Sequence, residues 1–135
     1  MARGIGIAGE ALGVAVRQRL SSTTAIAGVP FVLVQPAIAG TATYRLYDAN
    51  APKRFRVIRV WGVMTGAGGA GDTVVVNDGA NNITNVVSVA ALADQDVWDA
   101  VQIDDAQHTV DKGGSLRVVT ASDALSIVYI ECIWT

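Results

Sequence analysis

From Val29 onward, the sequence consists of short runs of β-branched and aromatic residues separated by glycine, proline, asparagine and aspartate. Turn sequences such as Asn77-Asp78-Gly79 fall between the runs, and these residues readily adopt the positive φ values of tight turns. The predicted strands are residues 31–34, 41–47, 55–64, 73–76, 83–89, 97–103, 116–120 and 125–134. Short strands at such regular spacing are typical of a β-sandwich or barrel. The sequence therefore predicts one all-β domain over residues 29–135.

The last predicted strand, residues 125–134, is apolar on both faces. Successive side chains of a strand point to opposite faces, and the first face consists of Val128, Ile130, Cys132 and Trp134. The second face carries Ile127, Tyr129 and Ile133, with Glu131 as its only polar residue. A strand with one solvated face alternates apolar and polar residues, so either another element covers the second face or it contacts another subunit. We predict that Ile127, Tyr129 and Ile133 form the interface of a homo-oligomer.

Strict alternation along residues 55–64 also gives two largely apolar faces beyond the basic start of the strand. The first of these predicted faces consists of Phe55, Val57, Arg59, Trp61 and Val63. The second consists of Arg56, Ile58, Val60 and Met64.

Residues 1–28 differ from the rest of the chain, since they are rich in glycine, alanine and serine and hold three arginines against one acidic residue. Leu12, Val16 and Leu20 follow the i, i+4, i+8 spacing of a helix face. Two alternatives remain open, a short helix over about residues 10–20 or a flexible tail that a partner orders. We therefore separate an N-terminal arm from the β-sandwich domain.

Charge is divided along the chain. Residues 1–60 carry eight Lys or Arg against two acidic residues, a net charge of +6, whereas residues 61–135 carry two against ten, a net charge of −8. Opposite fields on two parts of one chain favour docking within or between subunits. Hydrophobic residues make up 51% of the chain and charged residues only 16%, so the apolar surplus is expected to meet another subunit or a larger surface. These features predict a protein that assembles.

Several partner classes are not expected. The longest uncharged stretch, residues 20–44, is broken by prolines and polar residues, so it does not form a membrane-spanning helix of about 20 apolar residues. No signal peptide is recognised, and the low pI with an acidic second half argues against nucleic acid. The single cysteine, Cys132, excludes an internal disulfide and suits synthesis in a reducing compartment.

The candidate chemical motifs lack the context that catalysis requires. Residues 66–71 fit G-x-G-x-x-G, but a predicted strand follows where phosphate binding needs a helix. Asp104, Asp105 and His108 offer metal-ligand types without the pattern of a calcium loop, and we interpret them as part of solvated acidic loops. Cys132 lies in an apolar strand and is expected to be a buried small hydrophobe. We therefore expect no enzyme, no metal site and no cofactor.

Five stretches of turn-and-strand sequence resemble small virion proteins of tailed bacteriophages. They are Val60-Trp61-Gly62-Val63-Met64-Thr65-Gly66-Ala67-Gly68, Gly71-Asp72-Thr73-Val74, Asp78-Gly79-Ala80-Asn81, Ile103-Asp104-Asp105-Ala106 and Gly113-Gly114-Ser115-Leu116-Arg117-Val118. Over about residues 55–133 the chain is similar to capsid decoration (cement) proteins and related head or fibre auxiliaries. The resemblance implies a jelly-roll-like β-sandwich, commonly a homotrimer, without catalytic residues. It also implies synthesis in the host cytoplasm and a place on the virion surface, where the partner is the major capsid protein.

The N-terminal arm matches nothing in that family. Its composition and position alone predict that it contacts the capsid or a neighbouring subunit. The candidate capsid-contact residues are Arg3, Leu12, Val16, Arg17 and Arg19.

The alternative function is a phage fibre or lectin-like domain that binds carbohydrate. Sugar rings stack on exposed aromatic side chains, and Trp98, flanked by Val97 and Asp99, is the tryptophan expected to be exposed. Trp61 and Trp134 lie in apolar strands and are expected in the core or an interface.

Overall fold

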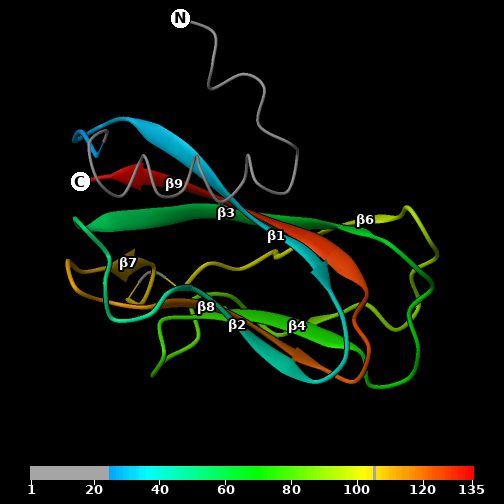
Figure 1. Ribbon diagram of the computed structural model, residues 1–135. Helices are drawn as coiled ribbons and strands as arrows, with labels where there is room; N and C mark the ends of the chain where they lie inside the picture. The colour runs from blue at the N-terminus through cyan, green and yellow to red at the C-terminus, as the bar shows by residue number, and fades with distance from the viewer. Residues whose placement is uncertain (1–24, 105) are drawn as a thin grey trace, which may run out of the picture.

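The computed structural model describes residues 25–104 and 106–135 as an all-β domain, with no helix among these residues (Figure 1). The strands are β1 (Pro30–Ile38), β2 (Ala42–Tyr47), β3 (Phe55–Met64), β4 (Thr73–Asn77), β5 (Val87–Ser88), β6 (Val97–Asp99), β7 (Thr109–Val110), β8 (Leu116–Ala121) and β9 (Ser126–Trp134). The predicted all-β class is confirmed. The predicted capsid contacts Arg3, Leu12, Val16, Arg17 and Arg19 lie outside the described residues.

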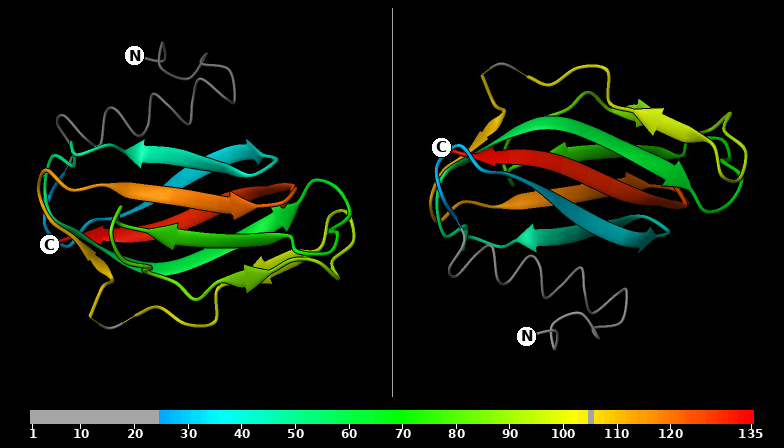
Figure 2. Two further views of the ribbon diagram at one scale, coloured as in Figure 1. Left: turned by 90° about the horizontal axis from the view of Figure 1, so that it is seen from below. Right: turned by 90° about the horizontal axis from the view of Figure 1, so that it is seen from above.

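The strands form two antiparallel sheets that pack face to face (Figures 1 and 2). Sheet A has the order β1-β9-β3-β6, with the short β7 also paired to β3, and sheet B has the order β2-β8-β4-β5. The pairs β1–β9, β2–β8, β3–β6 and β4–β5 thus alternate between the sheets, as in one long antiparallel ribbon wrapped around a core. This nesting is the strand order of a jelly roll, which confirms the predicted jelly-roll-like sandwich.

The core between the sheets is built on the inner face of β9. Its predicted inner side chains are all at most 1% exposed, namely Val128, Ile130, Cys132 and Trp134. The Trp134 ring stacks on Phe31 of β1 at a centroid distance of 4.1 Å and meets Phe55 of β3 edge to face at 5.6 Å. Because β1 and β3 both pair with β9, this aromatic cluster ties the three strands together from the inside.

A β-bulge interrupts β3. Val57 pairs with Cys132 and Arg59 pairs with Glu131, so two residues of β3, Ile58 and Arg59, lie opposite one residue of β9. Such an insertion shifts the phase of side-chain alternation along the bulged strand.

The bulge overturns the predicted division of the β3 faces. Phe55 and Val57 are buried before it, whereas Val60 and Met64 are buried after it. Strict alternation separates these two pairs, so that prediction is wrong: the extra residue brings both into one core. The residues wrongly grouped with Phe55, which instead point outward, are Arg59, Trp61 and Val63.

The first strand also differs from expectation, since β1 continues beyond the predicted end at Gln35-Pro36 as far as Ile38. The register shifts between Gln35 and Ile38, and Ala37 has a φ of 51°. β1 pairs on one side only, and a proline is tolerated in such an edge strand because its missing N–H leaves no ladder bond unmade.

The predicted strands 83–89 and 97–103 are shorter in the structure, where only β5 and β6 remain. The residues before β5 and after β6 pair with each other instead. Thr84 forms a bridge with Ile103, and the Asp104 N–H donates to the Ile83 carbonyl at 2.8 Å. This contact joins the two segments where they leave the sheets.

We expect Gly62→Ala to destabilise the fold. Gly62 pairs with Trp98 across β3 and β6, and a Cβ at position 62 would overlap the Trp98 ring. Overpacking a core typically costs about 1–3 kcal/mol, so the free energy of urea unfolding should fall by that order. Gly69→Ala is the control, because its Cβ would meet nothing closer than Asp72 Oδ2 at 3.6 Å. Equal stabilities of the two variants would contradict this reading.

Candidate functional site

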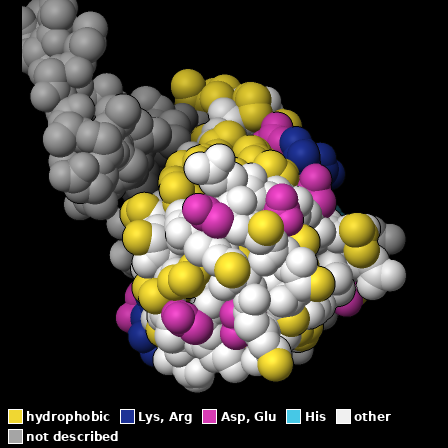
Figure 3. Space-filling view, turned by 90° about the vertical axis from the view of Figure 1, so that its right-hand side faces the viewer, with side chains coloured by type: hydrophobic (Ala, Val, Ile, Leu, Met, Phe, Trp, Pro, Cys, Tyr) yellow, Lys and Arg dark blue, Asp and Glu magenta, His cyan; other side chains and the backbone are white. Residues whose placement is uncertain are grey.

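The candidate functional site is the surface of sheet A that points away from the core, which we call the outer face of sheet A. Its residues are Val32, Val34, Arg56, Arg59, Trp61, Val63, Val97, Asp99, Ile127, Tyr129, Glu131 and Ile133. The structure places the predicted interface residues Ile127, Tyr129 and Ile133 together along β9, the strand between β1 and β3. Figure 3 shows hydrophobic side chains gathered along the upper side of the molecule, which is the side of sheet A.

The register of sheet A determines which of these side chains are neighbours. Tyr129 pairs with Val34 of β1 and with Trp61 of β3. The rings of Tyr129 and Trp61 stack with centroids 5.4 Å apart and planes inclined by 13°, a contact that contributes about 0.5–1.5 kcal/mol beyond the area it buries. Strict alternation along β3 grouped Trp61 with the buried Phe55, and the bulge at Ile58, which the sequence pattern did not reveal, turns Trp61 to the outer face.

A bidentate ion pair borders the aromatic stack. Arg59 donates from Nε to Asp99 Oδ1 at 3.2 Å and from Nη2 to Asp99 Oδ2 at 3.1 Å. The hydrogen bond to Asp99 raises the pKa of Arg59, and the guanidinium carbon lies 4.6 Å from the centre of the Trp61 ring. Both side chains of the pair are about half exposed, so it adds little stability. Its effect is to neutralise two charges beside an apolar surface.

Glu131 lies in the middle of the outer face, paired with Val32 on one side and Arg59 on the other. Its carboxylate makes no hydrogen bond or ion pair within residues 25–104 and 106–135. Arg59 is already bonded to Asp99. A surface that covered this carboxylate would have to offer Glu131 a hydrogen-bond donor or leave its charge unpaired.

The rim of the outer face exposes further apolar side chains. Val32 and Ile58 are each 40% exposed, and Val97 is 63% exposed. Exposed apolar side chains are typical of an interaction site when they form one continuous patch. The arrangement offers apolar contact, one aromatic stack and one directional carboxylate, which is the chemistry of binding.

Cys132 lies on the inner face of β9 and is fully buried. Burial raises the pKa of its thiol well above the ordinary value, and its Sγ lies 3.7 Å from the Ile130 carbonyl. The expectation of a buried small hydrophobe is confirmed.

Asp104 and His108 belong to one loop. The Asp104 carboxylate accepts the N–H groups of Ala106 at 2.7 Å and Gln107 at 3.1 Å, and His108 Nδ1 lies 3.2 Å from the Asp104 carbonyl oxygen. Asp105 lies outside the described residues. Among those that are described, no three His, Cys, Asp or Glu side chains are grouped so that they could hold a metal ion.

The glycine-rich stretch 66–71 connects β3 to β4. The Gly68 N–H donates to the Leu92 carbonyl at 2.8 Å, and a Cβ at position 68 would overlap the Val89 carbonyl oxygen. Glycine at position 68 therefore allows two backbone segments to touch.

Trp98 is 5% exposed, and its indole N–H donates to Ser126 Oγ at 3.2 Å. The prediction that Trp98 is an exposed platform is wrong, because β6 turns this side chain inward over Gly62. The structure also has a groove of about 420 Å³, formed by the segments before β5 and after β6. It is lined by Asn82, Thr84, Asn85, Gln102, Ile103 and Asp104.

Comparison with protein-family models, curated proteins and solved structures finds no match to this chain. Within the part of the chain that the structure describes, no helix has the length and apolarity needed to cross a membrane.

The buried thiol predicts a pH dependence of stability. Because burial raises the pKa of Cys132, the unfolded chain ionises first, from about pH 8.5 upward. The contribution of the neutral thiol is complete below that pH and is lost as the pH rises, at up to about 1.4 kcal/mol per pH unit. We expect the advantage of the wild type over Cys132→Ala in urea unfolding to shrink above about pH 8.5. Parallel stability curves for the two proteins would contradict this.

Proposed function

We propose that this protein is a structural assembly module that self-associates through the outer face of sheet A and decorates the outside of a phage capsid as a cement protein. The apolar outer face carries the proposal, because such a surface gains free energy when a partner removes it from water. Jelly rolls occur in viral capsid and lectin domains. Since a fold alone does not define a function, the character of the face provides the specific support.

Self-association uses the row of Ile127, Tyr129 and Ile133 at the centre of the face. Closed rotational symmetry is the usual result for soluble homo-oligomers, and the resemblance to decoration proteins favours a trimer. In a trimer the contact is heterologous, so the outer face of sheet A of one copy meets a different surface of the next. That second surface should supply a donor to Glu131.

The N-terminal arm anchors the oligomer to the major capsid protein through Arg3, Leu12, Val16, Arg17 and Arg19. The Gly28 N–H donates to the Trp134 carbonyl at 2.7 Å, which fixes where the arm joins the domain, at the end of β9. Ordering a residue costs roughly 1–2 kcal/mol, and exposed ion pairs contribute only about 0–1 kcal/mol each. Apolar contacts of the arm must therefore supply much of the binding free energy.

The alternative is a fibre or lectin-like domain. The observation in its favour is the groove lined by Asn82, Asn85, Gln102 and Asp104, whose amide and carboxylate groups suit sugar hydroxyls. No aromatic side chain is among the residues that line it. Copy number separates the two functions, since a cement protein is present many times per virion and a fibre tip only a few times.

We expect Tyr129→Glu to give monomers or insoluble protein, because a second carboxylate would face the partner beside Glu131. Val119→Glu is the matched comparison, since Val119 is an outward-facing, half-buried residue of β8, the corresponding central strand of sheet B. It should keep the mass of the wild type unless sheet B supplies the second surface of the contact. Light scattering coupled to size exclusion measures the mass of each variant. A soluble wild-type monomer at micromolar concentration would sink the proposal of self-association.

We expect deletion of residues 1–24 to leave a folded, self-associating protein that no longer binds capsids. This deletion keeps the contacts of Gly28 and Val29 with Trp134, so loss of the fold is not expected. Co-sedimentation with phage capsids that lack the protein measures binding, and light scattering measures assembly. Undiminished decoration by the truncated protein would show that the sandwich, rather than the arm, makes the capsid contact.

A further inference from the structure

Two arginines face each other on the outer surface of sheet B, opposite the surface described above. Arg45 of β2 and Arg117 of β8 are direct partners in the antiparallel register. Like charges in directly opposed positions destabilise a sheet. A pair of this kind therefore calls for an anion that both groups share.

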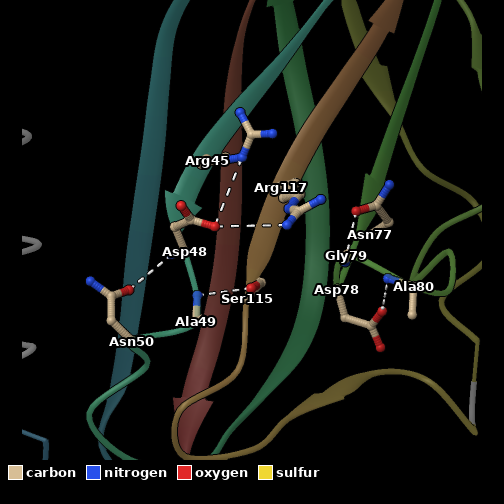
Figure 4. Close-up of polar contacts among 10 residues, drawn as sticks. All are labelled: Arg45, Asp48, Ala49, Asn50, Asn77, Asp78, Gly79, Ala80, Ser115 and Arg117. Atoms are coloured by element: carbon tan, nitrogen blue, oxygen red, sulfur yellow. Dashed lines mark hydrogen bonds and ion pairs between the residues drawn. The ribbon is translucent and has the colours of Figure 1, made fainter.

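The structure supplies only part of that anion. Asp48 Oδ1 lies 3.8 Å from Arg45 Nε and 3.7 Å from Arg117 Nη2 (Figure 4). Both distances exceed the range of charge-assisted hydrogen bonds, and neither guanidinium makes a hydrogen bond within the described residues. Arg117 Nε is buried without a partner. Two strong, multi-donor groups thus converge on one carboxylate oxygen without bonding it.

The guanidinium group of Arg117 packs against the turn that follows β4. Gly79, with a φ of +96°, passes so close that an added Cβ would lie 3.3 Å from the guanidinium carbon. The turn itself is fixed by the Gly79 N–H bond to Asn77 Oδ1 at 2.9 Å and by the Ala80 N–H bond to Asp78 Oδ1 at 2.9 Å (Figure 4). Only 27% of the Arg117 side chain is exposed, against 50% for Arg45. One member of the pair is therefore positioned in advance, and the other can adjust.

Asp48 is the most exposed of the three, at 63%. Its neighbour Ala49 donates its N–H to Ser115 Oγ at 2.9 Å, which fixes the loop but leaves the carboxylate free to turn. An incoming oxygen could take its place between the guanidinium groups.

We propose that Arg45 and Arg117 form a binding site for an oxyanion, either a phosphate group or a protein carboxylate. When no such ligand is bound, the Asp48 carboxylate occupies the site weakly. Guanidinium groups bind both anions through paired N–H donors. This site lies on the other sheet from the outer face of sheet A, and its binding of a free anion does not require self-association.

The test titrates the full-length protein with sodium phosphate and, separately, with sodium acetate, at an ionic strength held constant with sodium chloride. The Nε–Hε signals of Arg45 and Arg117 are followed by NMR. We expect both signals to shift saturably. Tighter binding of phosphate assigns the site to a phosphate group, and equal or tighter binding of acetate assigns it to a carboxylate. No saturable shift with either anion overturns the proposal.

Single substitutions separate a site from a general charge effect. Arg45→Gln, read from the Arg117 signal, and Arg117→Gln, read from the Arg45 signal, should each weaken binding about tenfold or more. Asp48→Asn should strengthen it several-fold, because it removes the competing carboxylate. Arg56→Gln, which removes an exposed arginine from β3 in the other sheet, should leave it unchanged.

Two outcomes with these variants would contradict the site. Equal weakening by Arg56→Gln and Arg45→Gln would mean that the shift reports net charge only. If the Asp48→Asn variant bound the anion more weakly than the wild type, Asp48 would not compete with the ligand. If Arg117→Gln fails to fold, Arg45→Gln still decides, because the Arg45 side chain is half exposed.

Discussion

The pairing of β9 with β1 on one side and β3 on the other is the contact on which the rest of this molecule depends. The inner side chains of β9 fill the core, and Phe31 and Phe55 of the two neighbouring strands close around Trp134. The outer side chains of the same strand are apolar as well, so burying the core necessarily presents an apolar surface on the other side. At roughly 25 cal/mol per Å² of apolar area, covering that surface is a substantial driving force for assembly. One strand therefore provides both a large part of the core and the surface that we propose for self-association.

The bulge at Ile58 and Arg59 determines what that surface is made of. A shift of one residue moves every later side chain of a strand to the opposite face. Because of the shift, Trp61 stacks on Tyr129 and Arg59 reaches Asp99, while Val60 and Met64 join the core. Glu131 is left as the one outer charge of β9 without an ion pair among the described residues. The outer face of sheet A thus depends on a backbone irregularity in a neighbouring strand as much as on β9.

The two sheets present different chemistry to their surroundings. The outer face of sheet A carries mostly apolar side chains, together with the Arg59–Asp99 pair and the single charges of Arg56 and Glu131. The outer surface of sheet B places Arg45 and Arg117 side by side with one shared acid. The division of charge along the sequence is partly satisfied by one ion pair inside the fold. Arg59 from the basic half bonds Asp99 from the acidic half within the same chain, so part of the charge division is satisfied inside the fold.

The sequence by itself determined the all-β class, the buried inner face of β9 and the candidate interface of Ile127, Tyr129 and Ile133. These features follow from alternation along a single strand, which is a local property that needs no knowledge of neighbours. The position of the bulge, the inward turn of Trp98 and the pairing of Arg45 with Arg117 depend on register between strands distant in sequence. Only the tertiary structure decided them. The free energy of an extra residue on one strand depends on how that strand packs and pairs with its neighbours, and the sequence pattern of a single strand carries no information about those neighbours.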